Sequence, residues 1–153
     1  MNTVQAVATI AYIQDQVSIE QLYSYLSVLQ VEYPKFREWY FEKVVPETIS
    51  GQRKILVASY EGKMAGVLIL KDSIQKKICT LRVWPEFRKM GIGHQLMTRA
   101  IYELNDERPL ITVSDDHVKE FSKLFLEYGF QCSQAYFGLY RKGHWEYVYN
   151  STL

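Results

Sequence analysis

Cysteine is scarce in this sequence, and long hydrophobic runs are missing from it. Cys79 and Cys132 are the only cysteines among 153 residues, and neither lies in a C-x-x-C or histidine-rich context. This usage excludes a disulfide-stapled secreted scaffold and argues against structural zinc, so we expect no metal. No apolar run approaches the roughly 18 residues of a transmembrane helix, and residues 1–4 lack the basic start of a signal peptide. We therefore expect a cytoplasmic protein with no membrane association.

The sequence also lacks a strong surplus of charge and any obvious linker. Its 18 Lys and Arg residues against 17 Asp and Glu residues leave a net charge of +1, so we expect no nucleic-acid partner and any anion site must be local. Only four prolines interrupt the chain, and no stretch is rich in Gly, Ser and Pro. Because the length is close to the roughly 150 residues typical of one domain, we expect residues 1–153 to form a single domain.

Hydrophobic periodicity predicts a mixture of helices and strands. Ser18 opens a capping box of the form S-x-x-Q, and the apolar spacing after it predicts a helix over residues 18–30. Pro34 suits the first turn of a second helix, which should end near Pro46. Further helices are expected over residues 91–104 and from Val118 to a stop at Gly129. Strands are expected over residues 7–13, 55–60, 64–71, 77–83, 110–114, 135–141 and 145–150.

The order of these elements indicates the fold class. The strands at 55–60, 64–71 and 77–83 follow one another through short turns, so this part of the sheet should be antiparallel. Helices both precede and follow it. We therefore expect an α+β fold with a mixed, mostly antiparallel central sheet and helices on both faces.

A candidate anion-binding turn lies at residues 88–93, where a strand leads through R-K-M-G-I-G into a helix. The first amides of a helix have no intrahelical partner, and the helix dipole is positive there, so the turn suits a diphosphate. A dinucleotide-binding fingerprint needs Gly or Ala where Leu96 stands, and a Walker loop needs Lys where His94 follows Gly93, so both are excluded. The alternative is that Gly91 and Gly93 only shape a tight turn.

The segment LRVWPEFRKMGIGHQLM at residues 81–97 closely resembles motif A of the GNAT superfamily of acyl-CoA-dependent N-acetyltransferases, with its R/Q-x-x-G-x-G/A core. The resemblance continues through the strand at 110–114 and through LFLEYGF at 124–130, and it covers about residues 51–140 well. It implies a GNAT-like fold and acetyl-CoA as cosubstrate. In this family the strand bearing Leu81 diverges from the strand bearing Val113, and the thioester lies in the gap.

The resemblance also implies which residues bind the cosubstrate. Backbone groups of residues 81–83 would hold the pantetheine arm, and the amides of residues 89–94 would hold the pyrophosphate. The Arg88 side chain would either join this site or brace the turn. The expected contacts are Leu81, Arg82, Val83, Arg88, Lys89, Met90, Gly91, Ile92, Gly93 and His94.

The sequence departs from the family pattern where catalysis is concerned. Many members have a Tyr where this chain has Phe125, which has no proton for the CoA thiolate, and an Asn where it has Val118. Tyr128 and Ser114 are the remaining weak catalytic candidates, and each has a structural alternative: packing for Tyr128, and capping of the following helix for Ser114, which would otherwise act through water. No catalytic residue is assigned, and direct attack by the amine with solvent-assisted proton transfer is expected.

Other polar residues at the strand ends also have two interpretations. Asp115 or Asp116 is expected to cap the helix that follows, although with Ser114 and His117 they lie near the expected thioester. Arg82 either selects a carboxylate on the acceptor or is a solvated strand arginine.

The expected function is therefore transfer of an acetyl group from acetyl-CoA to a primary amine of a small molecule or peptide. The family places the acceptor between the N-terminal helices and the C-terminal hairpin, where aromatic rings are abundant; those of the tail are equally consistent with a homodimer contact. The alternative function is a CoA-binding regulatory or scaffold protein with little catalysis. Acetylation of charged tRNA is disfavoured by the net charge. The rings are Phe36, Trp39, Tyr40, Trp145, Tyr147 and Tyr149.

Overall fold

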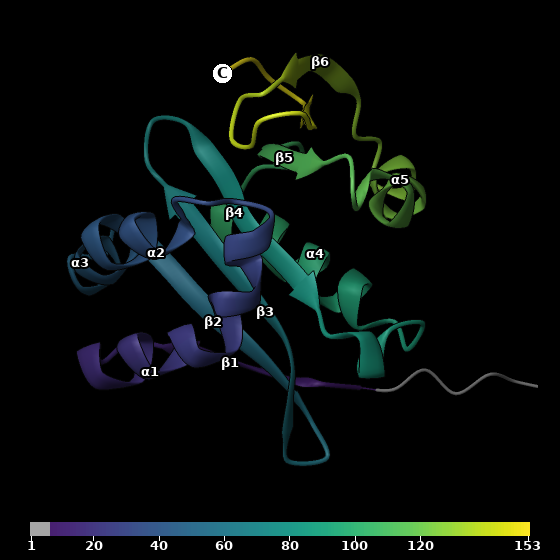
Figure 1. Cartoon of the computed structure of the whole chain (residues 1–153). Coiled ribbons are helices and arrows are strands. Elements are labelled where there is room, and N and C mark those ends of the chain that lie inside the picture. Colours follow the sequence, from purple (N-terminus) through teal and green to yellow (C-terminus); the bar gives the residue numbers. More distant parts are fainter. Residues whose placement is uncertain (1–6) are drawn as a thin grey trace, which may run out of the picture.

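In the computed structural model, which describes residues 7–153, a twisted seven-stranded sheet forms the centre of the molecule (Figure 1). The strand order is β1-β2-β3-β4-β5-β7-β6, and every neighbouring pair is antiparallel except β4 and β5. The expected α+β class with a mostly antiparallel sheet is confirmed. The strands are β1 Thr9–Ile13, β2 Arg53–Tyr60, β3 Lys63–Asp72, β4 Lys76–Val83, β5 Leu110–Ser114, β6 Cys132–Phe137 and β7 Trp145–Tyr149.

Helices cover both faces of the sheet, as expected. On one face lie α1 Gln16–Leu26, the 3₁₀ helix η1 Ser27–Val31, α2 Phe36–Trp39, the π-helix η2 Tyr40–Val44 and α3 Val45–Ile49. On the other face lie α4 Ile92–Leu104 and α5 Val118–Glu127, and the short 3₁₀ helix η3 Pro85–Phe87 leads from β4 toward α4. In the described part of the chain, no helix combines the length and the hydrophobicity that a bilayer crossing requires.

The alternation of side chains along β3 explains the two hydrophobic cores. Val67 and Ile69 pack into the cluster under α1 and α2, whereas Leu68 and Leu70 pack into the cluster under α4 and α5. All four are fully buried. A strand buried on both faces is therefore continuously apolar, which is how residues 64–71 read in the sequence.

The first helix begins earlier and ends earlier than expected. Asp15, not Ser18, is its N-cap, and the Asp15 carboxylate accepts a hydrogen bond from the Ser18 amide at 2.9 Å. After Leu26 the chain tightens into η1. The expected capping box with Ser18 as N-cap is therefore wrong. The helix begins three residues earlier, and the Asp15 side chain caps it by binding the Ser18 amide.

The second helix does not end at Pro46. The chain begins α2 at Phe36, passes through the π-helical residues of η2 and continues as α3 to Ile49. Pro46 stands in the first turn of α3, where its missing N–H costs no hydrogen bond within that helix. The wider π-turn before it provides the change of hydrogen-bond register that the sequence pattern does not reveal.

The C-terminal hairpin is displaced relative to its expected strands. β6 begins at Cys132 and ends at Phe137, so residues 138–144 form the connection instead of continuing the strand to 141. Gly138 has a φ of 75°, a left-handed conformation that ends the strand there. The remaining strands lie within about two residues of their expected positions, and β5 coincides with the expected 110–114.

Candidate functional site

The two parallel strands of the sheet are paired only at their beginning. β4 and β5 are in register at Lys77 with Leu110 and at Ile78 with Ile111, and the pairing stops there. On its other side β4 stays paired with β3 as far as Val83. Among the described residues, the edge of residues 81–83 that faces β5 therefore has no strand partner, and its backbone groups make no ladder hydrogen bonds on that side. This agrees with the divergence expected between the strands bearing Leu81 and Val113.

A cleft of about 690 Å³ lies at this gap between the two strands. Its floor is made by β4 and β5, and α5 contributes Phe121 and Phe125. The opposite wall comes from η1, α2 and the loop after β6, with Tyr33, Trp39 and Tyr140 among its residues. The cleft therefore borders both helical layers.

The turn before α4 leaves several amide groups free. Gly91 is the N-cap of α4 with a φ of 84°, and no side chain of the described residues caps the helix. The first helical hydrogen bond runs from the Gln95 amide to the Gly91 carbonyl at 3.2 Å, so the amides of Ile92, Gly93 and His94 precede the intrahelical ladder. Three adjacent N–H groups at a positive helix end suit an anion.

The two glycines of this turn differ in what they require. Gly91 adopts a left-handed conformation that a side chain disfavours. At Gly93, a Cβ atom would lie 3.7 Å from Leu124 Cδ2 and 4.0 Å from Val83 Cγ2, which are ordinary contacts. The case for glycine in the turn therefore rests on Gly91.

Charged side chains around the turn connect it to α5. Arg88 Nε lies 3.1 Å from Glu120 Oε1 and donates a long hydrogen bond of 3.5 Å to the Val83 carbonyl. His94 Nε2 lies 2.9 Å from Glu127 Oε2. Of the two roles considered for Arg88, these contacts favour bracing the turn. Lys89 is exposed and has a φ of 61°.

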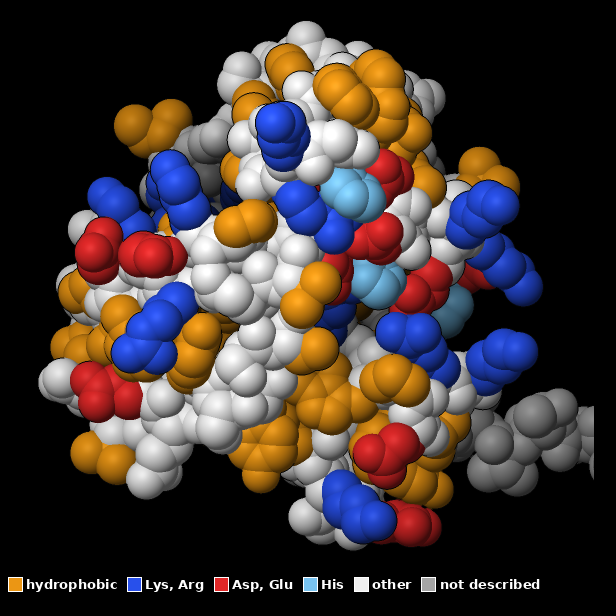
Figure 2. Space-filling view, viewed as in Figure 1, with side chains coloured by type: hydrophobic (Ala, Val, Ile, Leu, Met, Phe, Trp, Pro, Cys, Tyr) orange, Lys and Arg blue, Asp and Glu red, His pale blue; other side chains and the backbone are white. Residues whose placement is uncertain are grey.

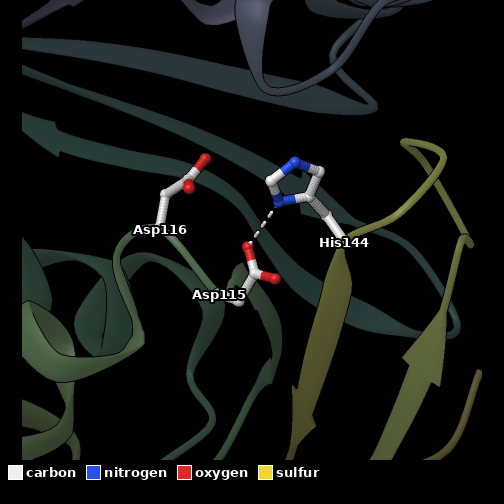
Figure 3. Close-up of side chains that lie close together, drawn as sticks. All are labelled: Asp115, Asp116 and His144. Carbon is white, nitrogen blue, oxygen red and sulfur yellow. Dashed lines mark hydrogen bonds and ion pairs between the residues drawn. The ribbon is translucent and has the colours of Figure 1, made fainter.

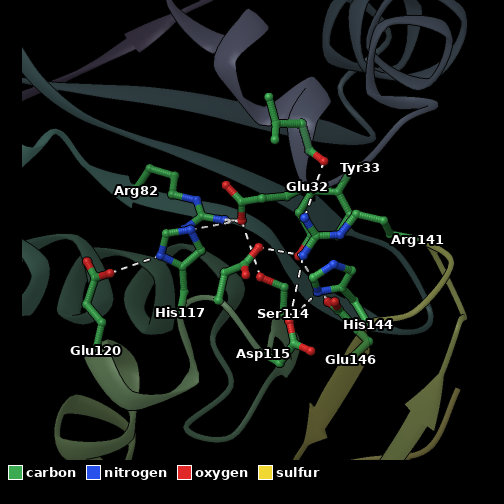
Figure 4. Close-up of polar contacts among 12 residues, drawn as sticks. Glu32, Tyr33, Arg82, Ser114, Asp115, His117, Glu120, Arg141, His144 and Glu146 are labelled. Carbon is green, nitrogen blue, oxygen red and sulfur yellow. Dashed lines mark hydrogen bonds and ion pairs between the residues drawn. The ribbon is translucent and has the colours of Figure 1, made fainter.

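Glu32, the C-cap residue that follows η1, connects four elements at the open end of the gap (Figure 4). Its Oε1 atom lies 2.5 Å from Arg82 Nη2 on β4 and 3.0 Å from His117 Nε2, and it accepts a hydrogen bond of 3.3 Å from Ser114 Oγ on β5. His117 Nδ1 in turn lies 3.0 Å from Glu120 on α5. The side chains of Arg82 and Glu32 are only 11% and 13% exposed, so Arg82 is not a solvated strand arginine.

A second buried carboxyl lies on the same face of the sheet. Glu146 stands opposite Ser114 in the β5–β7 register and is 3% exposed, and the Tyr33 hydroxyl donates a hydrogen bond of 3.0 Å to its Oε2. Burial raises the pKa of Glu146 above its ordinary value, against the opposing effects of the hydrogen bonds from Thr112 and Tyr33. Burial likewise raises the pKa of the Tyr33 phenol, and the charge of Glu146 adds to this rise. Tyr33 and Thr112 line the cleft, so they connect it to Glu146.

The two catalytic candidates occupy different surroundings. Ser114 ends β5 at the gap and is 2% exposed. The Tyr128 hydroxyl lies 2.7 Å from Thr98 Oγ1 and donates a hydrogen bond of 3.1 Å to the His94 carbonyl, and it is not among the residues that line the cleft. Tyr128 thus ties the end of α5 to the first turn of α4. Phe125, in contrast, lines the cleft and is 1% exposed.

Asp115 and Asp116 do not cap α5, contrary to expectation. His117 occupies the N-cap position without a side-chain cap. Asp115 instead accepts hydrogen bonds of 3.0 Å from the Trp145 amide and from His144 Nδ1 (Figure 3), and these contacts lower the pKa of the Asp115 carboxyl. The group of Asp115, Asp116 and His144 has donor atoms close enough for a metal, but the Arg141 guanidinium lies 2.5 Å from Asp116 and 3.7 Å from Asp115. A cation is therefore already present there, and the aspartates anchor the loop before β7.

The aromatic rings near the cleft divide between core and surface. Phe36 and Tyr40 are buried in the core, and Trp39 borders the cleft. Phe137 and Trp145 lie with ring centroids 5.3 Å apart and are exposed at the β6–β7 hairpin. Hydrophobic side chains gather at the top of Figure 2. To the right of centre in the same figure, histidine, acidic and basic side chains are interleaved.

Sequence reasoning missed Glu32, Tyr33 and Glu146. For Glu146 a signal existed, because in the strand after residue 144 it alternates onto the same side as the apolar Val148. A charged residue on an inward side indicates a buried, functional carboxyl. Glu32 lies between two irregular helices, and no local pattern indicates that its side chain reaches β4.

Comparison with known proteins identifies relatives of this architecture. A family model described as an acetyltransferase (GNAT) domain matches residues 14–139. No protein with a curated description matches the chain in sequence. Among solved structures, one described as an acetyltransferase of the GNAT family from Desulfovibrio desulfuricans has a TM-score of 0.70 at 13% identity, covering 94% of this chain and 97% of that one.

Two further solved structures contain coenzyme A. An acetyltransferase from Bacillus subtilis in complex with CoA has a TM-score of 0.65 at 16% identity, covering 96% of this chain and 100% of that one. An aminoglycoside 6′-N-acetyltransferase complexed with coenzyme A has a TM-score of 0.66 at 13% identity, covering 92% of this chain and 94% of that one. At such identities the likeness shows the fold.

Proposed function

The chain belongs to the GNAT acetyltransferase family, and from this premise we propose that residues 1–153 form one catalytic domain that transfers an acetyl group from acetyl-CoA to a primary amine. The observation that carries the proposal is the unpaired edge of β4 at residues 81–83, which borders the cleft close to the free amides of the α4 turn. A thioester arm and its diphosphate need these two features on neighbouring surfaces.

The chain's own residues suggest how the cosubstrate is held. The backbone of residues 81–83 pairs with the amide groups of the pantetheine arm as a further strand would. The amides of residues 89–94 hold the pyrophosphate at the positive end of α4, and Arg88 keeps this turn attached to β4 and α5. Acetyl-CoA supplies the activated acetyl group.

The reaction is direct attack by the amine. The amine nitrogen forms a bond to the thioester carbonyl carbon, the carbon–sulfur bond breaks, the nitrogen loses a proton and the CoA thiolate gains one. Because Phe125 stands where a phenol would be useful, solvent in the cleft gives the thiolate its proton. Glu146 accepts the proton of the amine through Tyr33, whose hydroxyl is hydrogen-bonded to it, because burial raises the pKa of this carboxyl and so favours its protonated form.

The acceptor enters on the side of the sheet covered by η1, α2 and the loop after β6. These elements provide the wall of the cleft opposite α5, with Tyr33, Trp39 and Tyr140. The acceptor is an amine of a small molecule or a peptide.

One observation favours a second candidate function, a CoA-binding regulatory or scaffold protein. Phe125 lines the cleft but offers no proton, and the Tyr128 hydroxyl is held by Thr98 and His94. A protein that only senses the coenzyme would need the turn and the β4 edge but neither a donor nor a base.

Two measurements test the proposal. Calorimetry should show CoA binding to the wild type and none to Gly91→Glu, because a carboxylate would enter the pyrophosphate site. Gly62→Glu is the matched control, since Gly62 has a φ of 76° and lies in the β2–β3 turn with nothing within 4 Å of its Cβ position.

Release of free CoA from acetyl-CoA in the presence of an amine panel would support the transferase. Tight CoA binding without release for any amine would support the regulatory function, and unchanged binding in Gly91→Glu would refute the site.

A further inference from the structure

Two lysines face each other at the part of the cleft where β4 and β5 are still paired. Lys71 on β3 and Lys77 on β4 are directly opposed in the antiparallel register, and both line the cleft. Both are half-buried, and among residues 7–153 neither ammonium group has an ion pair or a side-chain hydrogen bond. Like charges directly opposite on one sheet face destabilise a sheet. An unneutralised pair in a cleft therefore indicates a ligand.

A third cation lies beside this pair. Arg53 on β2 is 6% exposed, and its Nη1 atom lies 3.1 Å from Cys79 Sγ. Burial raises the pKa of the Cys79 thiol, and the charges of Arg53, Lys77 and Lys71 oppose that rise. The three cations thus converge on one place in the cleft floor.

Among the described residues no acidic side chain lies within ion-pair distance of either lysine, although Lys77 is close enough to Glu146 for its charge to oppose the rise in the pKa of that carboxyl. Arg53 has its own partner, since its Nε lies 2.5 Å from Glu47 Oε2. At the rim of the cleft, two exposed acids on α2 and η2 are accompanied by two exposed lysines of the same segment, so the charges of these four rim residues cancel. These rim residues are Glu38, Glu42, Lys35 and Lys43.

We infer that the acceptor carries an anionic group, a carboxylate or a phosphate, which binds between Lys71 and Lys77 while its amine lies at the β4–β5 gap. This inference rests on the proposed acetyl transfer. Leu81 follows Lys77 by four residues on β4, a rise of roughly 13 Å along an extended strand. The bulge at Cys79 shortens this rise, so the amine and the anion are separated by on the order of 10 Å. An α-amino acid is too short for this, so the acceptor is an elongated amine with a distal acid.

A series of ω-aminocarboxylates tests both the charge and the spacing. Glycine, γ-aminobutyrate, ω-aminohexanoate and ω-aminooctanoate are each compared with the n-alkylamine of equal length, and ω-aminohexyl phosphate distinguishes phosphate from carboxylate. Binding to the CoA-loaded protein is measured by calorimetry, and CoA release is measured separately. Aminooctanoate should bind about tenfold more tightly than octylamine, as expected for a charge-assisted hydrogen bond, and glycine should show no such preference.

Variants assign the preference to the two lysines. Lys71→Met and Lys77→Met should each remove the preference for the acid while leaving the affinity for CoA unchanged. Lys63→Met is the matched control, because Lys63 begins β3 outside the cleft and its loss changes the net charge equally. Equal binding of acid and alkylamine in the wild type, or a preference that survives both substitutions, would overturn the inference. Because binding is measured without turnover, a protein that releases no CoA would contradict the proposed transferase, and its binding preference would still establish or exclude the anion site.

Discussion

Glu32 Oε1 lies 2.5 Å from Arg82 Nη2, and this contact joins a 3₁₀ helix near the N-terminus to the β4 segment that borders the gap. The same oxygen is 3.0 Å from His117 Nε2. One carboxylate thus fixes the wall of the cleft relative to both its floor and α5. The backbone of Arg82 belongs to the unpaired edge, so the position of that edge depends on a residue fifty positions away in sequence.

Replacing Glu32 should therefore loosen the open end of the gap. Glu32→Gln keeps the shape but removes the charge that compensates Arg82 and His117, so we expect the free energy of unfolding to fall by about 2 kcal/mol. Urea unfolding measures this change. Glu107→Gln, at an exposed position, should change stability by less than about 0.5 kcal/mol. Equal stability of the two variants would contradict the bracing role.

The Tyr128 hydroxyl should matter for structure more than for chemistry. Tyr128→Phe removes its contacts with Thr98 and His94, which should cost about 1 kcal/mol of stability. Because the proposed mechanism has solvent protonate the thiolate, kcat should fall by less than about tenfold. Tyr102→Phe is the control, since Tyr102 is exposed on α4. A larger loss of kcat with unchanged CoA affinity would instead make Tyr128 the general acid.

The fold and the conformation of the turn before α4 were predictable because their signals are local. The apolar residues of β3, the strand at Leu110–Ser114 and the G-x-G turn before Ile92 each determine their own conformation through neighbours a few residues away. The irregular helices between Ser27 and Ile49 were not predictable, because the π-turn before Pro46 depends on packing against the sheet.

The side of the site proposed for the acceptor could largely not be predicted from the sequence. The local pattern predicts a helix cap at Asp115 or Asp116, yet the hairpin brings the Trp145 amide and His144 to Asp115 from thirty residues away. The opposition of Lys71 and Lys77 follows from strand register, which a bulge at Cys79 shifts. Such relationships require the strands to be placed before they can be recognised.

Removing either of the opposed lysines should stabilise the fold. Lys77→Met ends the repulsion with Lys71, so we expect the free energy of unfolding to rise by about 0.5 kcal/mol at low salt. The gain should shrink as salt is added, because salt screens the repulsion in the wild type. Lys63→Met should show neither effect. A loss of stability in Lys77→Met would indicate that the lysine makes a favourable contact in the folded protein.

Glu146 should give the protein a pH-dependent stability with a definite sign. Burial raises the pKa of Glu146 above 4.5, so the folded state favours the protonated carboxyl. The stability that Glu146 contributes through this pKa shift is fully present below pH 4.5 and is lost as the pH rises through the pKa of Glu146 in the folded protein. Glu146→Gln cannot lose a proton, and its amide oxygen can still accept the hydrogen bond from Tyr33. The stability of the variant minus that of the wild type should therefore increase as the pH is raised above 4.5, and urea unfolding across that range measures the difference.

Subtracting the two curves cancels the contributions of Glu103 and Asp115, whose pKa values are lowered and which therefore act in the opposite direction. A difference that stays flat with pH would show that Glu146 is as easily ionised in the folded protein as in the unfolded chain, and it would remove this carboxyl as the proposed base.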